Sequence, residues 1–358
     1  MRALGLDQYR FLGRSGLRVS PVALGTMTFG TEWGWGAAEQ EARAQFDLYV
    51  DRGGNFIDTA VNYTGGSSEK LLGRFIKDKR ERVVVATKFT MSREEGNPNA
   101  GGNHRLNIIR SVESSLRQLG TEWIDVLYLH SWDFTTGAEE VMRALDDLVR
   151  SGKVVYVGAS NTPAWRVAQM QTLAELRGWS PFIALQVEYS LVERTVEQDL
   201  LPMADANGLG VVAWSPLGGG LLSGKYSRAD LTGAKESATV TGSRREVIEA
   251  MGGLTERTLD IADTVRDIAR EHDASPSQVA LAWLLSRPVP AIPILGARTL
   301  DQLKSNLGAL DIVLSDDQLR RLDEASAVAP SFPHRFINGP MVQQLIFGGA
   351  KVTGRHAR

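Results

Sequence analysis

Eight short apolar runs alternate with longer amphipathic stretches along almost the whole chain, and this alternation limits the fold more than any other feature. The runs are rich in valine and isoleucine and mostly lack polar residues at alternate positions. They lie at residues 22–25, 55–58, 83–87, 124–130, 154–158, 182–186, 211–214 and 289–292. Strands that are buried on both faces of a parallel sheet have this composition. The pattern therefore predicts an α/β fold.

The stretches between the runs have the period of an amphipathic helix. One of them carries an apolar stripe and is followed by Gly120, a residue typical of helix ends; the stripe is Leu106, Ile109, Val112, Leu116 and Leu119. Two further stripes are Val141, Leu145, Leu148 and Val149, ended by Gly152, and Leu300, Leu303, Leu307 and Leu310. Eight strand–helix units predict a closed (β/α)₈ TIM barrel. The alternative is an open doubly wound sheet, which should carry a GxGxxG loop where Leu24-Gly25-Thr26-Met27 stands instead.

Three segments fall outside this alternation. Residues 9–20 contain two extended runs around Gly13-Arg14-Ser15-Gly16, which predicts a β-hairpin ahead of the barrel. Residues 223–253 are polar, and we expect them to form a long loop that serves as a lid. Residues 330–358 are expected to form an irregular tail, and the sequence leaves open whether this tail or the 223–253 loop covers the barrel mouth. With no internal linker, we expect a single domain over residues 1–358, with the barrel at about 20–325 and the tail at 326–358.

The amino-acid composition and net charge limit the classes of molecule that the protein can bind. The net charge of −2 provides no electrostatic surface for nucleic acid or an anionic membrane. The absence of cysteine excludes disulfides and thiolate chemistry, and the five histidines lack metal-binding spacing, so no metal is expected. No apolar run reaches the roughly 18 residues of a membrane helix, and the N-terminus is too short and polar for a secretory signal. We therefore expect a cytoplasmic protein that binds a small molecule, and a homo-oligomer is compatible with the sequence.

Four polar side chains stand at or just after the ends of three consecutive runs, and these are Asp58, Tyr63, Lys88 and His130. Because barrel strands end at one mouth, we expect them to converge there. A tyrosine has a pKa of about 10, and a nearby ammonium lowers it. We expect Lys88 to act in this way on Tyr63, with Asp58 paired to Lys88. His130 would orient a substrate carbonyl that Tyr63 protonates, although each residue alone also has an ordinary structural explanation.

The segment Asp58-Thr59-Ala60-Val61-Asn62-Tyr63 resembles the DTAxxY motif of the aldo-keto reductase family. Further similar segments follow in the family's order, namely Lys88, His130, Gly158-Ala159-Ser160-Asn161, Gln186, Trp214-Ser215-Pro216-Leu217, Gly224-Lys225-Tyr226 and Ile294-Leu295-Gly296-Ala297-Arg298. The resemblance covers about residues 11–325 and is strongest to bacterial aryl-alcohol-dehydrogenase-like and potassium-channel-β-subunit-like members. It implies that Tyr63, Lys88, Asp58 and His130 form the catalytic tetrad.

The resemblance also implies that NADP(H) is the cofactor. In the family, the residues at Ser160, Asn161 and Gln186 hold the nicotinamide carboxamide, which needs both donors and acceptors. The full set implied is Gly25, Thr26, Met27, Asp58, Ser160, Asn161, Gln186, Trp214, Ser215, Leu217, Gly218, Gly220, Lys225, Gly296, Arg298, Gln302 and Asn306. Arg298 precedes an expected helix, whose positive end suits a phosphate, and an arginine there favours NADPH. Arg244 is a further candidate for the same phosphate, and Ser305 departs from the glutamate that many members carry.

Aromatic residues gather in the loops after the first, third and fourth runs. We expect Trp33, Phe89 and Trp132 to line an apolar substrate pocket. The expected function is NADPH-dependent reduction of an aldehyde or ketone, with aromatic aldehydes first and sugars or polyketide-derived ketones still open. The alternative is an NADPH-binding regulatory module that resembles potassium-channel β-subunits and turns over very slowly. A metal-dependent hydrolase would need more ligands at the strand ends than Asp58 and His130.

Overall fold

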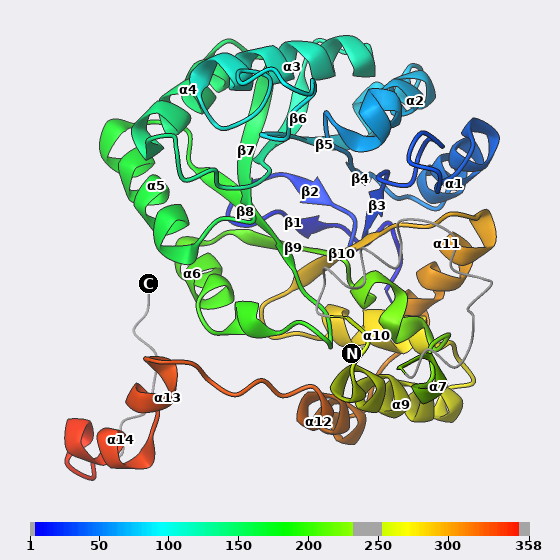
Figure 1. The fold of residues 1–358 in the computed structure, drawn as a ribbon, viewed down its shortest axis with the longest axis vertical. Coiled ribbons are helices and arrows are strands. Elements are labelled where there is room, and N and C mark those ends of the chain that lie inside the picture. The colour runs from blue at the N-terminus through cyan, green and yellow to red at the C-terminus, as the bar shows by residue number, and fades with distance from the viewer. Residues whose placement is uncertain (1–3, 232–252, 351–358) are drawn as a thin grey trace.

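Eight parallel strands close into a barrel in the computed structural model, which describes residues 4–231 and 253–350 of the chain. The order around the ring is β10-β3-β4-β5-β6-β7-β8-β9, as Figure 1 shows. The strands are β3 (Ala23–Gly25), β4 (Phe56–Asp58), β5 (Val84–Phe89), β6 (Ile124–Leu129), β7 (Val154–Ser160), β8 (Phe182–Glu188), β9 (Gly210–Trp214) and β10 (Ala291–Leu295). The predicted (β/α)₈ barrel is confirmed, and the open sheet is excluded. The last predicted run, 289–292, began too early because Val289 and Pro290 are apolar but belong to the loop before β10.

Helices surround the barrel between successive strands (Figure 1). They are α1 (Glu39–Asp51), α2 (Ser67–Ile76), α3 (Arg105–Leu119), α4 (Ala138–Arg150), α5 (Ala164–Arg177), α6 (Leu200–Asn207), α10 (Pro276–Leu285) and α11 (Leu300–Leu307), with α7 (Arg228–Leu231) and α9 (Glu256–Glu271) inserted after β9 and α12 (Asp316–Ala325) following α11. In the part of the chain that is described, no helix is long and apolar enough to cross a membrane.

The buried face of α3 differs from the predicted stripe. Leu106 is 45% exposed, whereas Asn107, Ile108 and Ser111 are buried with Val112. Small polar side chains pack against the barrel here, so a search for apolar residues alone assigns the face wrongly. The predicted end of this helix is confirmed, because Gly120 is its left-handed C-cap with φ of 62°.

Side chains alternate along each strand between the barrel interior and the helix layer. Phe56, Val84, Ala86, Val126 and Tyr128 form part of the interior cluster, while their neighbours in sequence pack under the helices. The next inward positions toward the carboxyl ends are Asp58, Lys88 and His130, which therefore point into the mouth.

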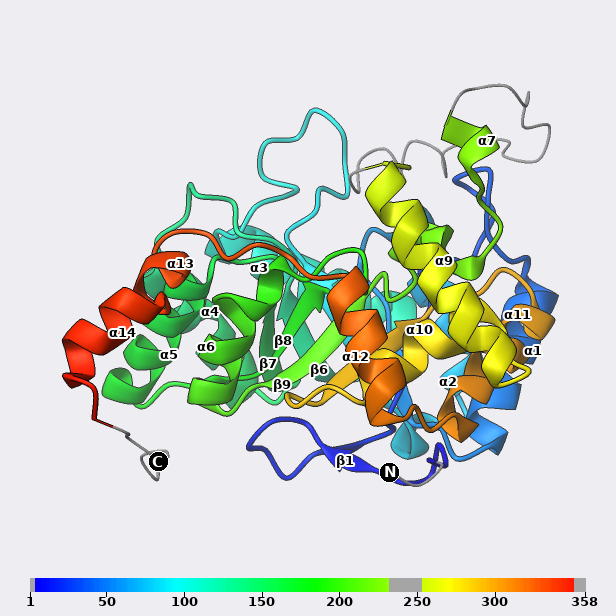
Figure 2. The same ribbon diagram turned by 90° about the horizontal axis from the view of Figure 1, so that it is seen from below.

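The predicted hairpin is present, and it closes the end of the barrel opposite the mouth. Its antiparallel strands are β1 (Arg10–Phe11) and β2 (Arg18–Val19), and Figure 2 shows it on the side away from the long loops. Leu12 and Val19 are fully buried in the interior cluster. Gly13 has φ of 60°, and a Cβ there would lie 2.3 Å from the carbonyl oxygen of Ile183. The hairpin thus packs directly on the barrel floor.

The predicted lid can be described only at its two ends. Residues 232–252, including Arg244, lie outside the described residues. At the start of the segment, Arg228 of α7 forms ion pairs with three carboxylates of α9, those of Glu256 at 3.1 Å, Asp263 at 2.6 Å and Asp260. These contacts fix α7 to the outer surface of α9.

The prediction of an irregular tail was wrong for the residues that are described. They form α13 (His334–Ile337) and α14 (Pro340–Phe347), which lie outside the ring of helices, beyond α6 (Figure 1). His334 Nε2 lies 2.9 Å from Asp199 Oδ1 at the start of α6, and Ser331 Oγ donates to Gln198 Oε1 at 2.6 Å. These polar contacts draw the tail along the flank of the barrel.

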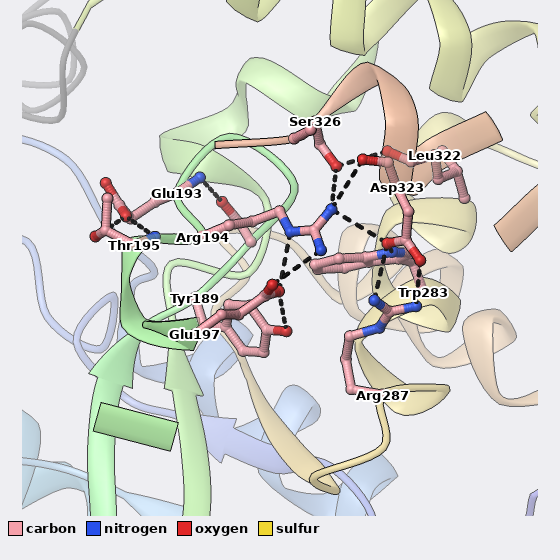
Figure 3. A network of polar contacts seen from close by, with 12 residues as sticks. Tyr189, Glu193, Arg194, Thr195, Glu197, Trp283, Arg287, Leu322, Asp323 and Ser326 are labelled. Atoms are coloured by element: carbon pink, nitrogen blue, oxygen red, sulfur yellow. Dashed lines mark hydrogen bonds and ion pairs between the residues drawn. The ribbon is translucent and has the colours of Figure 1, made fainter. Parts of the chain in front are cut away.

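A network of charged groups attaches α12 to the barrel wall, as Figure 3 shows. Asp323 accepts hydrogen bonds from Trp283 Nε1 at 2.9 Å and from Arg287 Nη1 at 2.8 Å. Arg194 lies 3.1 Å from the same carboxylate and also bonds Glu197 at 2.9 Å. Both arginines stack on the Trp283 ring, at 5.1 and 4.4 Å from its centroid. The network therefore joins α12, α10 and the loop after β8.

Candidate active site at the carboxyl ends of the strands

Lys88 is the centre of the polar cluster at the mouth. Its Nζ donates to Asp58 Oδ1 at 2.5 Å, to the carbonyl oxygen of Thr59 at 2.8 Å and to the Tyr63 hydroxyl at 3.1 Å. The side chains of Lys88 and Asp58 are almost completely buried. Gln186 Nε2 donates to the second oxygen of Asp58 at 2.8 Å, which fixes the carboxylate. The expected pairing of Asp58 with Lys88 is thus present, and all three ammonium protons have acceptors.

The pKa of Lys88 is raised, because Asp58 and Tyr63 together outweigh the effect of burial, which lowers it. The side chain therefore remains an ammonium at neutral pH. Lys88 acts to lower the pKa of Tyr63, as expected, but the net pKa of Tyr63 is not lowered. Burial raises the pKa of Tyr63 and the Asp58 carboxylate adds to this, so the opposing effect of Lys88 is exceeded. Tyr63 is consequently a phenol that retains its proton until another group accepts it.

His130 differs from an ordinary titrating histidine. Burial, followed by repulsion from Lys88, lowers its pKa to about 3. Its Nδ1 is buried and has no hydrogen-bond partner among the described residues. Its ring lies 6.0 Å from the Tyr63 ring between centroids. A neutral imidazole beside the tyrosine can hydrogen-bond a carbonyl but has no spare proton to release at neutral pH.

The predicted carboxamide-binding residues lie on neighbouring strands. Ser160 and Gln186 are in register on β7 and β8, and Trp214 ends β9. Trp214 Nε1 donates to Asn161 Oδ1 at 3.0 Å, while Asn161 Nδ2 donates to the carbonyl oxygen of His130 at 2.9 Å. Ser160 Oγ is buried without a partner in the described part of the chain. The buried Ser160 hydroxyl needs a hydrogen-bond partner, which a nicotinamide carboxamide would supply. The indole of Trp214, held by its hydrogen bond to Asn161, offers a face for the nicotinamide ring.

The loop after β9 has an unusual run of positive φ angles. They are 51° at Ser215, 57° at Gly218, 64° at Gly219 and 104° at Gly220. A Cβ on Gly218 would lie 2.6 Å from Val192 Cγ2, so glycine is required there. Leu217 lies within this loop, and Lys225 follows it with its ammonium 4.8 Å from the Tyr226 ring. The N–H groups of Gly218 and Gly220 donate to carbonyl oxygens within the loop, and that of Gly219 donates to Ser215 Oγ, so the loop is tightly folded. Its lack of side chains allows a phosphate to approach the backbone closely.

The residues expected near a second phosphate meet at the start of α11. The backbone N–H of Arg298 donates to Gln302 Oε1 at 2.9 Å, and the Arg298 side chain is exposed. Gly296 borders open space, whereas Asn306 is only 8% exposed. The N–H of Leu300 donates to the carboxylate of Glu41 from α1. Sequence reasoning missed Glu41, because nothing in the local pattern of α1 indicates that it reaches α11.

Several predicted site residues do not present their side chains to the mouth. Thr26 is fully buried and its Oγ1 donates to the carbonyl oxygen of Asp58, so it supports β4. A Cβ on Gly25 would lie 2.6 Å from Ile294 Cγ2, which explains this glycine by strand packing. Phe89 alternates with Lys88 and is fully buried in the helix-side core. Because successive side chains of a strand point to opposite faces, the Phe89 side chain points away from the mouth that Lys88 enters, and it does not line the pocket.

The two tryptophans and Met27 are placed differently. The Trp33 ring is 6.3 Å from the Tyr63 ring between centroids and 37% exposed, so it borders the mouth. Trp132 is 5% exposed, packs against the helix-side core and lies under the guanidinium of Arg166 at 4.7 Å. Met27 is 38% exposed. Of the predicted aromatic pocket, Trp33 therefore has the clearest place beside the tetrad.

A buried carboxyl lies behind the tetrad and was not predicted. Glu69 of α2 is fully buried, and Thr87 Oγ1 donates to its Oε1 at 2.5 Å. Burial raises the pKa of Glu69 to about 7, against the opposing effect of its hydrogen bonds. In the sequence Ser67-Ser68-Glu69-Lys70 the residue is typical of an exposed first helical turn, so the local pattern gave no signal of its burial.

Comparisons with known proteins agree with the geometry. The model of the aldo/keto reductase family matches residues 21–327. A norsolorinic acid reductase of Aspergillus flavus is 36% identical over 343 residues, which cover 93% of this chain and 84% of the relative. An aryl-alcohol dehydrogenase of Pestalotiopsis microspora is 35% identical over 349 residues, covering 94% and 87%. An uncharacterized oxidoreductase of Bacillus subtilis is 37% identical over 329 residues, covering 88% and 95%.

These matches extend over the whole barrel and include proteins named as reductases and dehydrogenases. Members of the family generally use NAD(P)H and act on small molecules. The chain therefore belongs to the aldo/keto reductase family and is an oxidoreductase of carbonyl compounds and alcohols.

Proposed function

We propose that this protein reduces an aldehyde or ketone to the alcohol with NADPH and that Tyr63 donates the proton. One observation carries the proposal: a protonated tyrosine lies 3.1 Å from a buried ammonium and beside a histidine that is neutral because its pKa is about 3. Of the polar groups around this point, Tyr63 is the one with a proton to give and a cation to stabilise the resulting phenolate.

The nucleotide would be held by the groups that line the mouth. Ser160, Asn161 and Gln186 would bind the nicotinamide carboxamide, Trp214 would stack on its ring, and the glycine loop at 218–220 would bind the pyrophosphate. A reduced nicotinamide supplies the hydride that is added to the carbonyl carbon. The buried Ser160 hydroxyl without a partner supports this assignment most directly.

The four polar residues at the mouth have separate roles in the proposed reaction. The neutral imidazole of His130 orients the carbonyl oxygen by a hydrogen bond. As that oxygen gains negative charge, Tyr63 transfers its phenolic proton to it, and Lys88 stabilises the phenolate that is left. Asp58 holds Lys88 at 2.5 Å and keeps it charged. Water returns a proton to Tyr63 after the alcohol has formed.

The choice of NADPH rests on Arg298. Its guanidinium is exposed beside the start of α11, where it can bind an adenosine 2′-phosphate. Arg298→Gln should raise the KM for NADPH roughly tenfold to a hundredfold and leave the KM for NADH unchanged, given about 1.5–3 kcal/mol for a charged hydrogen bond. Lys304→Gln, which removes a positive charge from α11 itself, is the matched control. Equal loss with both nucleotides would contradict the assignment.

For the substrate we favour aromatic aldehydes. Trp33 offers an aromatic face next to Tyr63, and a relative at 35% identity is named an aryl-alcohol dehydrogenase. The test is NADPH oxidation, followed by nicotinamide absorbance, over aromatic aldehydes, aliphatic aldehydes and sugars. We expect the highest kcat/KM with an aromatic aldehyde and a selective loss of it in Trp33→Ala. Tight NADPH binding without turnover on any carbonyl would instead favour a regulatory module.

A further inference from the structure

The tail helices α13 and α14 expose large apolar side chains to solvent. None of the eight residues of α14 is buried against the described part of the chain. Six large apolar side chains of the two helices are 42–76% exposed, and these are Phe336, Ile337, Met341, Leu345, Ile346 and Phe347. At about 200 Å² for a fully exposed large side chain, they present roughly 700 Å² of apolar surface. The largest apolar patch of a typical monomer is about 300–600 Å², so the two helices carry an unusual amount.

Polar contacts anchor the tail at its base. Ser331 Oγ donates to Gln198 Oε1 at 2.6 Å, and His334 Nε2 lies 2.9 Å from Asp199 Oδ1. Beyond these contacts, α14 lies outside the ring of helices (Figure 1). A helix of this length is too short to be stable by itself in water, so packing must supply most of its stability. The described chain does not provide that packing, which points to a second molecule.

A second exposed surface lies on α5, which neighbours α6 on the same flank of the barrel (Figure 1). Its outermost residues follow helical spacing and carry no charge, and they are Trp165, Gln169, Thr172 and Leu176. We call this row the α5 stripe. Its two ends, Trp165 and Leu176, are 59% and 79% exposed. An outward helix face is normally charged, as Glu139, Glu140 and Arg143 make that of α4.

The α5 stripe and α14 match each other in length and in chemistry. At about 1.5 Å per residue, the stripe extends over about 16 Å and α14 over about 12 Å. Neither contains a charged residue. The centres of protein interfaces are depleted of charge and enriched in aromatic residues and methionine. Arg166, Glu175 and Arg177 flank the stripe, as the polar rim of an interface does.

Two other occupants fit these surfaces less well. A helix that lies on a membrane surface carries Lys or Arg on its polar face, whereas the polar residues of α14 are Gln343 and Gln344. An unrelated protein would have to supply an uncharged surface that this chain already has on α5. Two copies related by a two-fold axis form such a contact twice, because each contributes one tail and one stripe.

We propose that the protein forms a two-fold symmetric dimer in which α13 and α14 of each copy pack on the α5 stripe of the other. Together the tail helices and the stripe offer roughly 1,000 Å² of apolar surface per copy. Each partner in a stable interface buries about 800 Å², so this area is sufficient. The contact lies on the flank of the barrel and does not depend on the role proposed for Tyr63.

Sedimentation velocity of the full chain, from micromolar down to nanomolar concentration, tests the assembly. We expect a particle of twice the mass of the chain at micromolar concentration. Leu345→Glu and Leu176→Glu each place a charge in the contact and should raise the dissociation constant of the dimer roughly 30-fold or more. Leu106→Glu, at an exposed leucine of α3 outside the contact, is the matched control and should leave the constant unchanged.

A chain that is monomeric at micromolar concentration, or a dimer that neither Leu345→Glu nor Leu176→Glu weakens, would overturn the proposal. Monomers that sediment together with phosphatidylglycerol vesicles would also overturn it, because the tail would then bind a membrane surface.

Cross-linking identifies which surfaces meet, because the chain has no cysteine of its own. A chain with both Leu345→Cys and Leu176→Cys should form a covalent dimer with a short bismaleimide, and chains with either change alone should not. A covalent dimer from Leu345→Cys alone would show that tail packs on tail and would refute the proposed contact. So would a double variant that sediments as a dimer but forms no covalent one.

Discussion

The ion pair of Lys88 and Asp58 is hidden from solvent, with the two side chains 0% and 4% exposed. Asp58→Asn removes the negative charge but retains the shape of the side chain and one oxygen acceptor. It leaves the Lys88 ammonium buried among Thr59 O and the Tyr63 hydroxyl, neither of which carries a full charge. Removing one partner of such a pair costs about 3–5 kcal/mol of folding free energy.

Two further variants distinguish the cost of an unpaired charge from the cost of altered packing. Lys88→Met should cost a similar amount, because it leaves the Asp58 carboxylate unpaired. The double variant should cost less than either single one, since no uncompensated charge remains. Urea unfolding followed by tryptophan fluorescence measures all three.

The dependence on pH makes this prediction sharper. In the wild type the pKa of Lys88 is raised, so its contribution to stability is fully present below the ordinary pKa and is lost only as pH rises through the raised value. In Asp58→Asn the effect of Asp58 is lost, and burial, the largest effect on Lys88, should exceed the remaining effect of Tyr63, so the pKa of Lys88 should fall below the ordinary value of about 10.4. The folded variant then releases a proton that the unfolded chain keeps, and its stability rises with pH.

The deficit of Asp58→Asn should therefore shrink between about pH 7 and about pH 9. A variant as stable as the wild type at neutral pH would refute the reasoning. So would a deficit that stays constant with pH, because it would show that Lys88 is not an uncompensated ammonium in the variant.

Three further predictions concern groups around the site. The pKa of buried Glu69 is raised to about 7, so the wild type should gain up to about 3 kcal/mol of stability as pH falls from about 8 to about 5. Urea unfolding of Glu69→Gln should show no such gain. Gly158→Ala places a Cβ 2.5 Å from Tyr128 Cε1 and should cost about 1–3 kcal/mol in thermal unfolding, whereas Gly137→Ala, with no atom near its Cβ, should not. In Glu41→Gln the affinity for NADPH should rise roughly twofold to fivefold relative to the affinity for NADH, because the Glu41 carboxylate competes with a phosphate at the start of α11. Nucleotide fluorescence titrations measure both affinities, and an equal rise in both would contradict this prediction.

The barrel, and the convergence of Asp58, Lys88 and His130 at its mouth, could be predicted because both follow from local periodicity, whereas Tyr63 lies in the loop after β4 and was identified through the resemblance of its segment to a family motif. Asp58, Lys88 and His130 are each two positions beyond an inward-facing strand residue, so the period of two that defines the strands also directs these side chains into the mouth. The same rule excludes Phe89 from the pocket, and applying it to Lys88 and Phe89 together would have avoided that error.

Other features depend on contacts between distant parts of the chain. Glu41 reaches the start of α11 across more than 250 positions of sequence. The direction of the Tyr63 pKa depends on how deeply the hydroxyl is buried, which a motif does not encode. The burial of Glu69 likewise arises from packing against neighbours that no local pattern identifies.

The most direct test of the proposed chemistry is the turnover of Tyr63→Phe. NADPH oxidation would be followed with an aromatic aldehyde, and NADPH affinity would be measured separately by fluorescence titration. With its proton donor removed and its ring retained, the variant should lose roughly 10²- to 10⁴-fold in kcat and bind NADPH as the wild type does. Wild-type turnover in Tyr63→Phe would contradict the role of Tyr63 as the proton donor.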